Sequence, residues 1–404
     1  MRFMIEGFHN SKFTPIFILL FVVIASIEAQ EIGDVYYPEP IVCPHKQSPV
    51  NVKPIIKLKS ESRSMVTCSN ISTFTATYDS SMPAAAQTAF EHALGLLEDI
   101  FDASVPITVD VTWEDVPGNA IGFAGSPWRA NLSFLPQNDI WYPEPLINQF
   151  FGSQFDSSSD INMTLDSSTN WYFGTNGNPA NSQIDLITVV LHEISHGMGF
   201  AGTASSDGTA SGSSIGWGSN DWPNIYDLQI ENGAGNSITN YNSGSAGLLL
   251  QLIGDDLHFD GFYCNGAHQG EPAQTKADVP WQQGSSFSHL DASFNGEIMR
   301  SFVLTGSAIH TLDTLTVSIF RDMGWDVCAD NCPTEFTVTN NNELGGTQAH
   351  DASFQSDGEI ESLQTINNGQ TVEYISDDCV EMLEGFHSNA NVTFEARIGP
   401  CGDY

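Results

Sequence analysis

The stretch Ile184–Phe200 reads IDLITVVLHEISHGMGF and contains the pattern H-E-x-x-H. On an α-helix, residues four positions apart lie one above the other on the same face. His192 and His196 can therefore direct two imidazoles at one metal ion. Glu193 stands beside them as a carboxylate that need not be a ligand. The pattern predicts half of a zinc site on one helix.

The neighbouring residues favour this helix. Ser182 and Asp185 form S-x-x-D, a start signal of the capping-box kind. Apolar residues recur at helical spacing and predict a buried stripe of Ile187, Val190, Leu191, Ile194 and Met198. Gly197 and Gly199 are expected to end the helix, because glycine adopts a left-handed turn at little cost. The alternative is a chance match to a short motif, which this context disfavours.

Composition narrows the class of protein. The chain has 404 residues, 41% of them hydrophobic, which suits two or three domains with a substantial core. Twelve Lys and Arg stand against 49 Asp and Glu, a net charge of −37. A phosphate backbone would be repelled, so the sequence predicts no nucleic-acid partner. The acidity otherwise favours solubility; a structural Ca²⁺ ion is compatible with it, although no EF-hand loop is present.

Residues 1–29 are predicted to be a signal peptide. Pro15–Ser26 reads PIFILLFVVIAS, which is short for a membrane span, and Ala29 suits cleavage. We therefore expect a secreted, extracellular protein, with cell-surface association left open, and no stable membrane span after signal removal. The alternative is an uncleaved anchor.

The cysteine content agrees with export. The chain has seven cysteines: Cys43, Cys68, Cys264, Cys328, Cys332, Cys379 and Cys401. In an exported chain they favour disulfide bonds. We expect Cys379 to pair with Cys401, and next Cys43 with Cys68. The odd count leaves at least one thiol free or intermolecular.

Periodicity divides the rest of the chain. Residues 30–70 are polar and proline-rich, typical of an N-terminal segment or a short propeptide. Strands are predicted at Phe74–Tyr78, 107–113 and 161–165, with a helix after Ser81. Beyond Phe200 the period is lost for about ninety residues, which read as a long insertion rich in Gly, Ser and Asn. Helical spacing returns at Leu312, Leu315, Ile319 and Met323.

The end of the chain has strand character. After a predicted linker over 328–343, alternation at Val372 and Tyr374 recurs over 392–398. Residues 344–404 are therefore expected to form a small all-β module.

A catalytic zinc needs a third protein ligand from downstream. Gly199 points to the pattern H-E-x-x-H-x-x-G-x-x-H, but Gly202 stands where its last histidine would be. His289 follows His196 by 93 residues, and Met299 follows ten residues later. With this spacing the chain resembles the leishmanolysin-like metzincins of secreted bacterial type, in which an insertion precedes the third histidine and a Met-containing turn follows. The resemblance covers roughly residues 71–325.

The resemblance implies a function for these residues. Residues 71–327 would be an α+β zincin catalytic domain, with a mixed twisted sheet and an active-site helix. His192, His196 and His289 would bind Zn²⁺, with Met299 as an apolar floor. Glu193 would act as the general base toward a zinc-activated water, making the protein a secreted zinc metalloendopeptidase that acts on a protein or peptide substrate. The C-terminal module is similar to short β-repeat modules of secreted Bacteroidetes proteins.

Several alternatives stay open. The competing third ligands are His258, His268 and His310, or Glu231 and Glu271 in a Glu-type zincin. Met299 is equally compatible with an ordinary core residue. A free Cys43 would be able to block the zinc, in place of its disulfide with Cys68. The chain is also compatible with a secreted adhesion or carbohydrate-binding protein carrying an inactive zincin domain; a glycosidase would need paired carboxylates, and no pair stands out.

Overall fold

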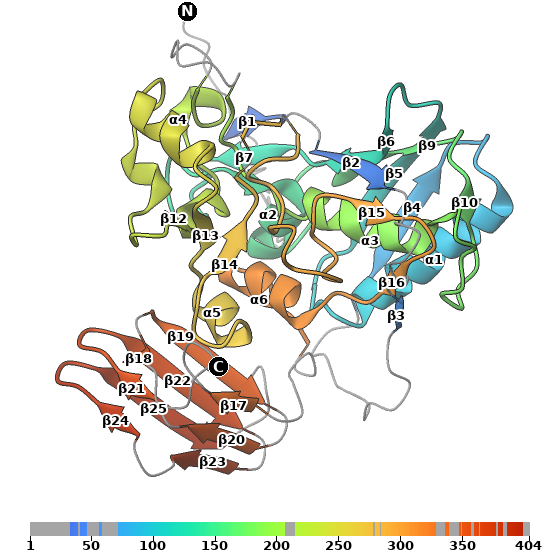
Figure 1. The fold of residues 1–404 in the computed structure, drawn as a ribbon. Coiled ribbons are helices and arrows are strands. Elements are labelled where there is room, and N and C mark those ends of the chain that lie inside the picture. The colour runs from blue at the N-terminus through green and yellow to red at the C-terminus, as the bar shows by residue number, and fades with distance from the viewer. Residues whose placement is uncertain are drawn as a thin grey trace, which may run out of the picture. The chain divides into compact units, whose positions relative to one another are not determined.

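The structure is a computed structural model (Figure 1). It describes residues 33–38, 41–46, 56–58, 72–206, 215–277, 279–282, 284–328, 336–338, 347–348, 350–356, 359–362, 364–376, 379–382 and 386–398. The predicted signal peptide lies outside these residues. Within them, six α-helices and several sheets form a mixed α and β fold, and none of the helices has the length and apolarity needed to cross a membrane.

A six-stranded sheet forms the centre of the body, in the order β15-β2-β6-β9-β5-β4. Its strands are β2 (Ile41–Lys46), β4 (Phe74–Tyr78), β5 (Ile107–Glu114), β6 (Ala120–Gly125), β9 (Ile161–Asp166) and β15 (Val303–Leu304). β4, β5 and β9 are parallel, and β6 pairs antiparallel with β9. The strands predicted at Phe74–Tyr78, 107–113 and 161–165 are confirmed.

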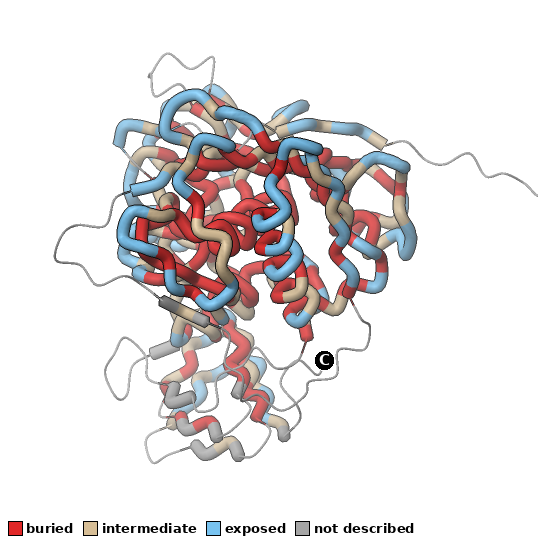
Figure 2. The backbone as a smooth tube through the Cα atoms, turned by 90° about the vertical axis from the view of Figure 1, so that its right-hand side faces the viewer, coloured by how far each residue is buried: buried red, intermediate tan, exposed pale blue. Residues whose placement is uncertain are grey.

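Two helices lie side by side on this sheet, α1 (Ala84–Glu98) and α3 (Leu186–Gly197). α1 buries Phe90, Leu94 and Leu97, as its apolar spacing predicts. Every residue of α3 is buried, and Figure 2 shows that such buried residues run through the interior while exposed residues lie on outer loops. The H-E-x-x-H motif therefore lies deep in the body.

The start of α3 differs from the prediction. Asp185 is the N-cap, and its Oδ1 accepts from the backbone N–H of Thr188 at 2.8 Å. Ser182 is not the cap, because the chain still runs as short strand β11 (Ile184–Asp185) beyond it. The helix ends at Gly197, and Gly199 has φ +112°, a conformation that favours glycine. The expected glycine stop is confirmed.

The long insertion contains short elements joined by loops. They are η1 (Ser219–Asp221), η2 (Asp227–Gln229), β12 (Ile230–Asn232), η3 (Ile238–Asn240), α4 (Ala246–Leu252), β13 (Leu257–Phe259), α5 (Phe262–Ala267) and β14 (Ala273–Thr275). β12, β13 and β14 form an antiparallel sheet. Elements this short hold no full hydrophobic period, which explains why the sequence pattern is lost here.

Smaller elements complete the body. They are β7 (Trp128–Ala130), β8 (Tyr142–Pro143), α2 (Glu144–Phe151), β10 (Trp171–Tyr172), β16 (Ala308–His310) and α6 (Thr314–Asp322). α6 is the helix expected from the spacing of Leu312 to Met323, and Gly324 follows it with φ +98°.

The N-terminal segment, expected to be irregular, instead supplies three strands. β1 (Asp34–Tyr36) pairs with β7, β2 lies between β6 and β15, and β3 (Ile56–Leu58) pairs with β16. Strands of only three to six residues, one of which contains Pro44, give little signal of their own, and partners distant in the sequence stabilise them.

The C-terminal module is all-β in its described residues, as predicted. Three successive passes of the chain each add one strand to three parallel sheets. The strands are β17 (Phe336–Val338), β18 (Thr347–Gln348) and β19 (Ala352–Ser356); β20 (Glu359–Ser362), β21 (Thr365–Ile366) and β22 (Thr371–Ser376); and β23 (Cys379–Met382), β24 (His387–Ser388) and β25 (Thr393–Ile398). Aromatic rings pack edge to face inside it, with the ring centres of Phe354 and Phe394 each 5.3 Å from that of Tyr374. β17 lies inside the segment expected to be a linker.

Candidate metal centre

Three histidines meet in the buried interior of the body. His192 and His196 lie one turn apart on α3, and His289 comes from the chain after β14. The Nε2 atom of His196 lies 3.1 Å from that of His192 and 3.2 Å from that of His289, and the remaining pair is 3.3 Å apart. All three side chains are buried. The structure thus brings two histidines of one helix together with a third from far along the chain.

The other ring nitrogen of each histidine contacts a backbone carbonyl. The acceptors are the carbonyls of Ile298, 2.8 Å from His192, of Phe200, 2.7 Å from His196, and of Ser285, 2.7 Å from His289. A carbonyl only accepts, so each Nδ1 carries the hydrogen and each neutral ring presents a lone pair at Nε2. Three lone pairs converge with no hydrogen between them, an arrangement that a cation satisfies.

The spacing fits a tetrahedral metal ion. With metal–nitrogen bonds of about 2.05 Å, tetrahedral zinc places its nitrogen ligands about 3.3 Å apart. Burial lowers the pKa of His192 to about 4, and lowers the pKa of His196 and of His289 well below the usual value. The imidazoles therefore stay neutral, which is the form that binds a metal.

Glu193 lies beside the three histidines and is fully buried. Neither of its carboxylate oxygens has a hydrogen-bond partner among the described residues. Burial raises the pKa of Glu193 to about 8, although the nearby Cys43 thiol and Ala124 N–H favour its charged form. A buried carboxylate without partners next to three converging imidazoles suits a proton acceptor better than a structural ion pair.

Gly202 explains why the third histidine is displaced. A Cβ atom at Gly202 would lie 2.1 Å from the ring of Phe287. The backbone N–H of Gly202 also donates to Ser288 Oγ at 3.1 Å. Residue 202 therefore has no room for a side chain, because the segment that carries His289 packs against it.

Met299 is fully buried in the turn after His289. Its carbonyl accepts from the N–H of Leu290 at 2.9 Å. The preceding residue, Ile298, supplies the carbonyl that orients His192. The turn thus links two of the three histidines through its backbone.

The competing ligands lie elsewhere. His310 donates from Nε2 to Asp185 Oδ1 at 2.9 Å, at the other end of α3. His268 contacts the carbonyl of Glu271, and Glu231 belongs to a second cluster with Asp260 and His350. His258 lies opposite Glu231 on β13.

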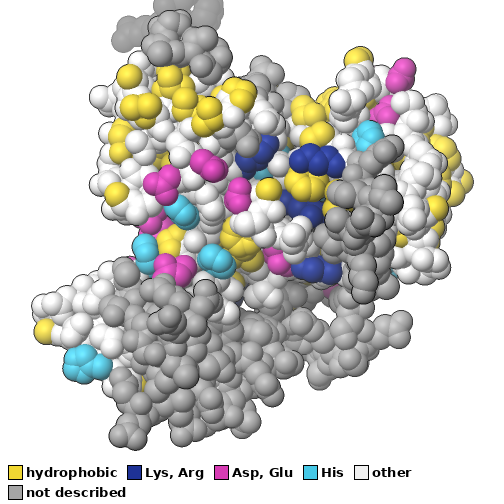
Figure 3. Space-filling view, viewed as in Figure 1, with side chains coloured by type: hydrophobic (Ala, Val, Ile, Leu, Met, Phe, Trp, Pro, Cys, Tyr) yellow, Lys and Arg dark blue, Asp and Glu magenta, His cyan; other side chains and the backbone are white. Residues whose placement is uncertain are grey.

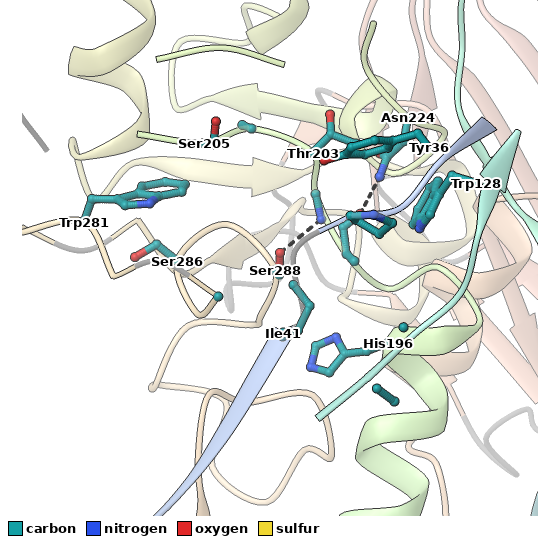
Figure 4. A pocket seen from close by; sticks show the side chains of 17 residues that line it. Tyr36, Ile41, Trp128, His196, Thr203, Ser205, Asn224, Trp281, Ser286 and Ser288 are labelled. Carbon is teal, nitrogen blue, oxygen red and sulfur yellow. Dashed lines mark hydrogen bonds between the residues drawn. The ribbon is translucent and has the colours of Figure 1, made fainter. Parts of the chain in front are cut away.

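A pocket of about 120 Å³ opens beside His196 (Figure 4). One wall is the loop after α3, including Thr203, and another includes Ser288. Tyr36 and Ile41 of the N-terminal segment also line it. The segment before the body therefore covers part of the space next to the histidines.

Two residues that hold this pocket were missed by sequence reasoning. Asn224 donates from Nδ2 to the carbonyl of Ala201 at 2.5 Å. Asp227 accepts from the N–H groups of Thr203 at 3.1 Å and of Asn224 at 2.9 Å, and its burial raises its pKa to about 7. They lie in the aperiodic insertion, where only the N-x-x-D turn spacing hints at them.

Cys43 reaches the same centre from β2. Its Sγ and ligand atoms of His192 and Glu193 all lie within 4.8 Å of one another. Cys43 is free and buried, so the predicted Cys43–Cys68 disulfide is wrong. Burial and the neighbouring Glu193 raise the pKa of the Cys43 thiol. Cys264 is also free and buried, Cys328 is disulfide-bonded, and the predicted partner of Cys379, Cys401, lies outside the described residues.

Comparison with known proteins gives partial matches. A family model described as SPBPB7E8-like matches residues 42–208. This range holds the two-histidine helix. The Schizosaccharomyces pombe protein named "Uncharacterized protein PB7E8.01" is 28% identical over 145 residues, which cover 32% of this chain and 23% of that relative. Neither match names an activity, so the resemblance to leishmanolysin-like metzincins stays a prediction.

Proposed function

We propose that the chain is a secreted zinc endopeptidase of the metzincin class, with a leishmanolysin-like arrangement of ligands. One observation carries the proposal: the Nε2 atoms of His192, His196 and His289 converge at 3.1–3.3 Å beside the unpartnered carboxylate of Glu193. Imidazole nitrogens in this number suit zinc and leave a fourth position open.

In the proposed reaction, the histidines would hold the zinc ion and Glu193 would transfer the proton. When bound, zinc supplies a Lewis acid that polarises the peptide carbonyl and lowers the pKa of a water molecule to about 7. The positive charge favours the ionised form of Glu193, which accepts the proton of the attacking water and passes it to the leaving amine. The backbone carbonyls at the three Nδ1 atoms hold the imidazoles in position.

Casein cleavage with and without a chelator tests the proposal. Purified protein should contain zinc at the histidine trio and cleave casein, and chelation should abolish cleavage until zinc is restored. Cleavage that persists after complete metal removal would contradict the mechanism. Zinc without cleavage, even after proteolytic removal of residues 33–58, would favour the inactive adhesion protein instead.

The N-terminal segment supports a latent form of this enzyme. β2 pairs antiparallel with β6 and lies between β6 and the short strand β15, so it occupies the side of β6 to which an extended peptide could otherwise add. Cys43 of β2 places its thiol beside His192 and Glu193, with one ligand atom of each residue within 4.8 Å of the others. A thiolate is a good zinc ligand, so β2 would exclude both substrate and water. On this proposal, residues 30–70 act as a propeptide.

Cys43→Ala should therefore raise the casein-cleavage rate of the full chain. A contact that stabilises the blocked form by only about 1.4 kcal/mol keeps the metal site blocked in about nine-tenths of the molecules. Removing this contact should therefore increase the cleavage rate ~10-fold or more. Cys264→Ala is the matched control, since Cys264 is also free and buried but lies on α5. Equal rates for the two variants and the unmodified chain would show that the thiol does not block the site.

A further inference from the structure

A second group of metal-ligating side chains lies away from the histidine trio. It consists of Glu231 on β12, Asp260 after β13 and His350 before β19. Nδ1 of His350 is 3.4 Å from Asp260 Oδ1 and 3.9 Å from Glu231 Oε1. The side chains of Glu231, Asp260 and His350 are 14%, 28% and 24% exposed, so they are shielded yet reachable by an ion from solvent. Figure 3 shows acidic and histidine side chains gathered in this part of the surface.

The charges in this group are unbalanced. Glu231, Asp260 and His350 line an open cavity of about 710 Å³. Neither Lys nor Arg is among the described residues that line this cavity. The cavity lining therefore holds one imidazole and three carboxylates, those of Glu231, Asp260 and Asp351. Burial, and next the charge of Asp260, raise the pKa of Glu231 to about 7. A divalent cation would relieve this repulsion.

Asn265 provides an independent sign of a missing partner. It lines the same cavity and is 1% exposed. Its Nδ2 donates to Asp260 Oδ1 at 2.5 Å and to the carbonyl of Asp351 at 2.9 Å. Its Oδ1 is buried without a hydrogen-bond partner among the described residues. An amide oxygen in this state is unfavourable unless a cation or a donor reaches it.

The backbone of β19, which follows His350, packs closely against the body. A Cβ atom at Gly266 of α5 would lie 1.7 Å from the carbonyl oxygen of Ser353 on β19. Arg321 of α6 donates to Gln355 Oε1 at 3.0 Å. These contacts fix the start of β19 against the body, and with it the position of His350.

We propose that Glu231, Asp260 and His350 bind a divalent transition-metal ion, Zn²⁺ or Mn²⁺, which ties the insertion to the C-terminal module. Carboxylates suit Mn²⁺ and Zn²⁺, and an imidazole favours these ions over Ca²⁺, which takes oxygen ligands. The site does not depend on the proposed peptidase activity.

Counting metal ions per chain tests this site. Untagged full chain is stripped with a chelator and titrated with Zn²⁺, and separately with Mn²⁺. The unmodified chain should bind two equivalents of Zn²⁺, while His350→Asn and His289→Ala should each bind one. The affinity of the second site for either ion should fall at least ~100-fold in His350→Asn, since loss of even an outer-shell partner costs 10–100-fold.

His387→Asn is the matched control, because His387 is an exposed histidine of β24 in the same module; it should keep two equivalents. Glu231→Gln repeats the test with a variant of the same shape, should His350→Asn unfold. Two equivalents in both His350→Asn and Glu231→Gln would overturn the site, as would binding of one Zn²⁺ by the unmodified chain and none by His289→Ala. If only the histidine trio failed to bind zinc, the result would be distinguishable: the unmodified chain would bind one equivalent of Zn²⁺ and His350→Asn would bind none.

Discussion

Glu193→Ala is expected to keep zinc and to lose peptide hydrolysis by at least ~10²-fold, the usual contribution of a positioned general base. The three imidazoles are oriented by the backbone carbonyls and not by Glu193, so the metal ligands should remain in place. Neither carboxylate oxygen of Glu193 has a hydrogen-bond partner among the described residues, although the Cys43 thiol and the Ala124 N–H lie near it, so its removal should disturb the fold little. Zinc content and kcat/KM on a quenched peptide measure the two effects separately.

Two further variants sharpen this test. Glu193→Gln keeps the shape of the side chain but removes its basicity, and it should be as inactive as Glu193→Ala. Glu91→Ala makes the same change at an exposed position of α1 and should leave kcat/KM unchanged. Full activity in Glu193→Gln would show that another group accepts the proton, and loss of zinc in Glu193→Ala would make this residue a ligand.

His289→Ala should weaken zinc binding at the histidine trio by at least ~100-fold, judged from the 10–100-fold cost of losing even an outer-shell partner. Two histidines on one helix form only half a site. The third arrives at the end of a long insertion whose closure costs entropy, by about 0.6 kcal/mol for each doubling of length. Zinc coordination and the packing of Met299 offset that cost.

Zinc removal should accordingly loosen residues 201–299 more than α1 and the central sheet. Hydrogen exchange of the stripped and zinc-loaded protein measures this difference. His258→Ala and His268→Ala make the same change at histidines outside the trio, and both should retain the affinity of that centre. Unchanged zinc affinity in His289→Ala, or a loss in His268→Ala, would mean that the third ligand is another residue.

The elements predicted from the sequence are those with enough length to show a period. α3 spans twelve residues and α1 fifteen, and β5 buries every second side chain. The pairing of His192 with His196 follows from helical geometry alone. The position of His289 next to His196 cannot be predicted in this way, because no local rule relates residues 93 positions apart. There the family resemblance supplied the expectation.

The features that were missed depend on partners far away in the sequence. β2 is a strand because β6 and β15 pair with it on its two sides, although Pro44 lies within it. The three successive passes of the chain in the C-terminal module are built from strands of two to six residues. Strands this short do not reveal the repeat in the sequence. Glu231 and His350 are 119 residues apart, and only the docking of β19 on α5 brings them together.

X-ray diffraction from crystals of the zinc-loaded protein, recorded on both sides of the zinc absorption edge, tests the central claim most directly. An anomalous peak is expected about 2.05 Å from the Nε2 atoms of His192, His196 and His289, with Glu193 next to it but outside bonding distance. A zinc-loaded crystal without a peak between these three nitrogens, or with Glu193 bonded to the metal there, would contradict it.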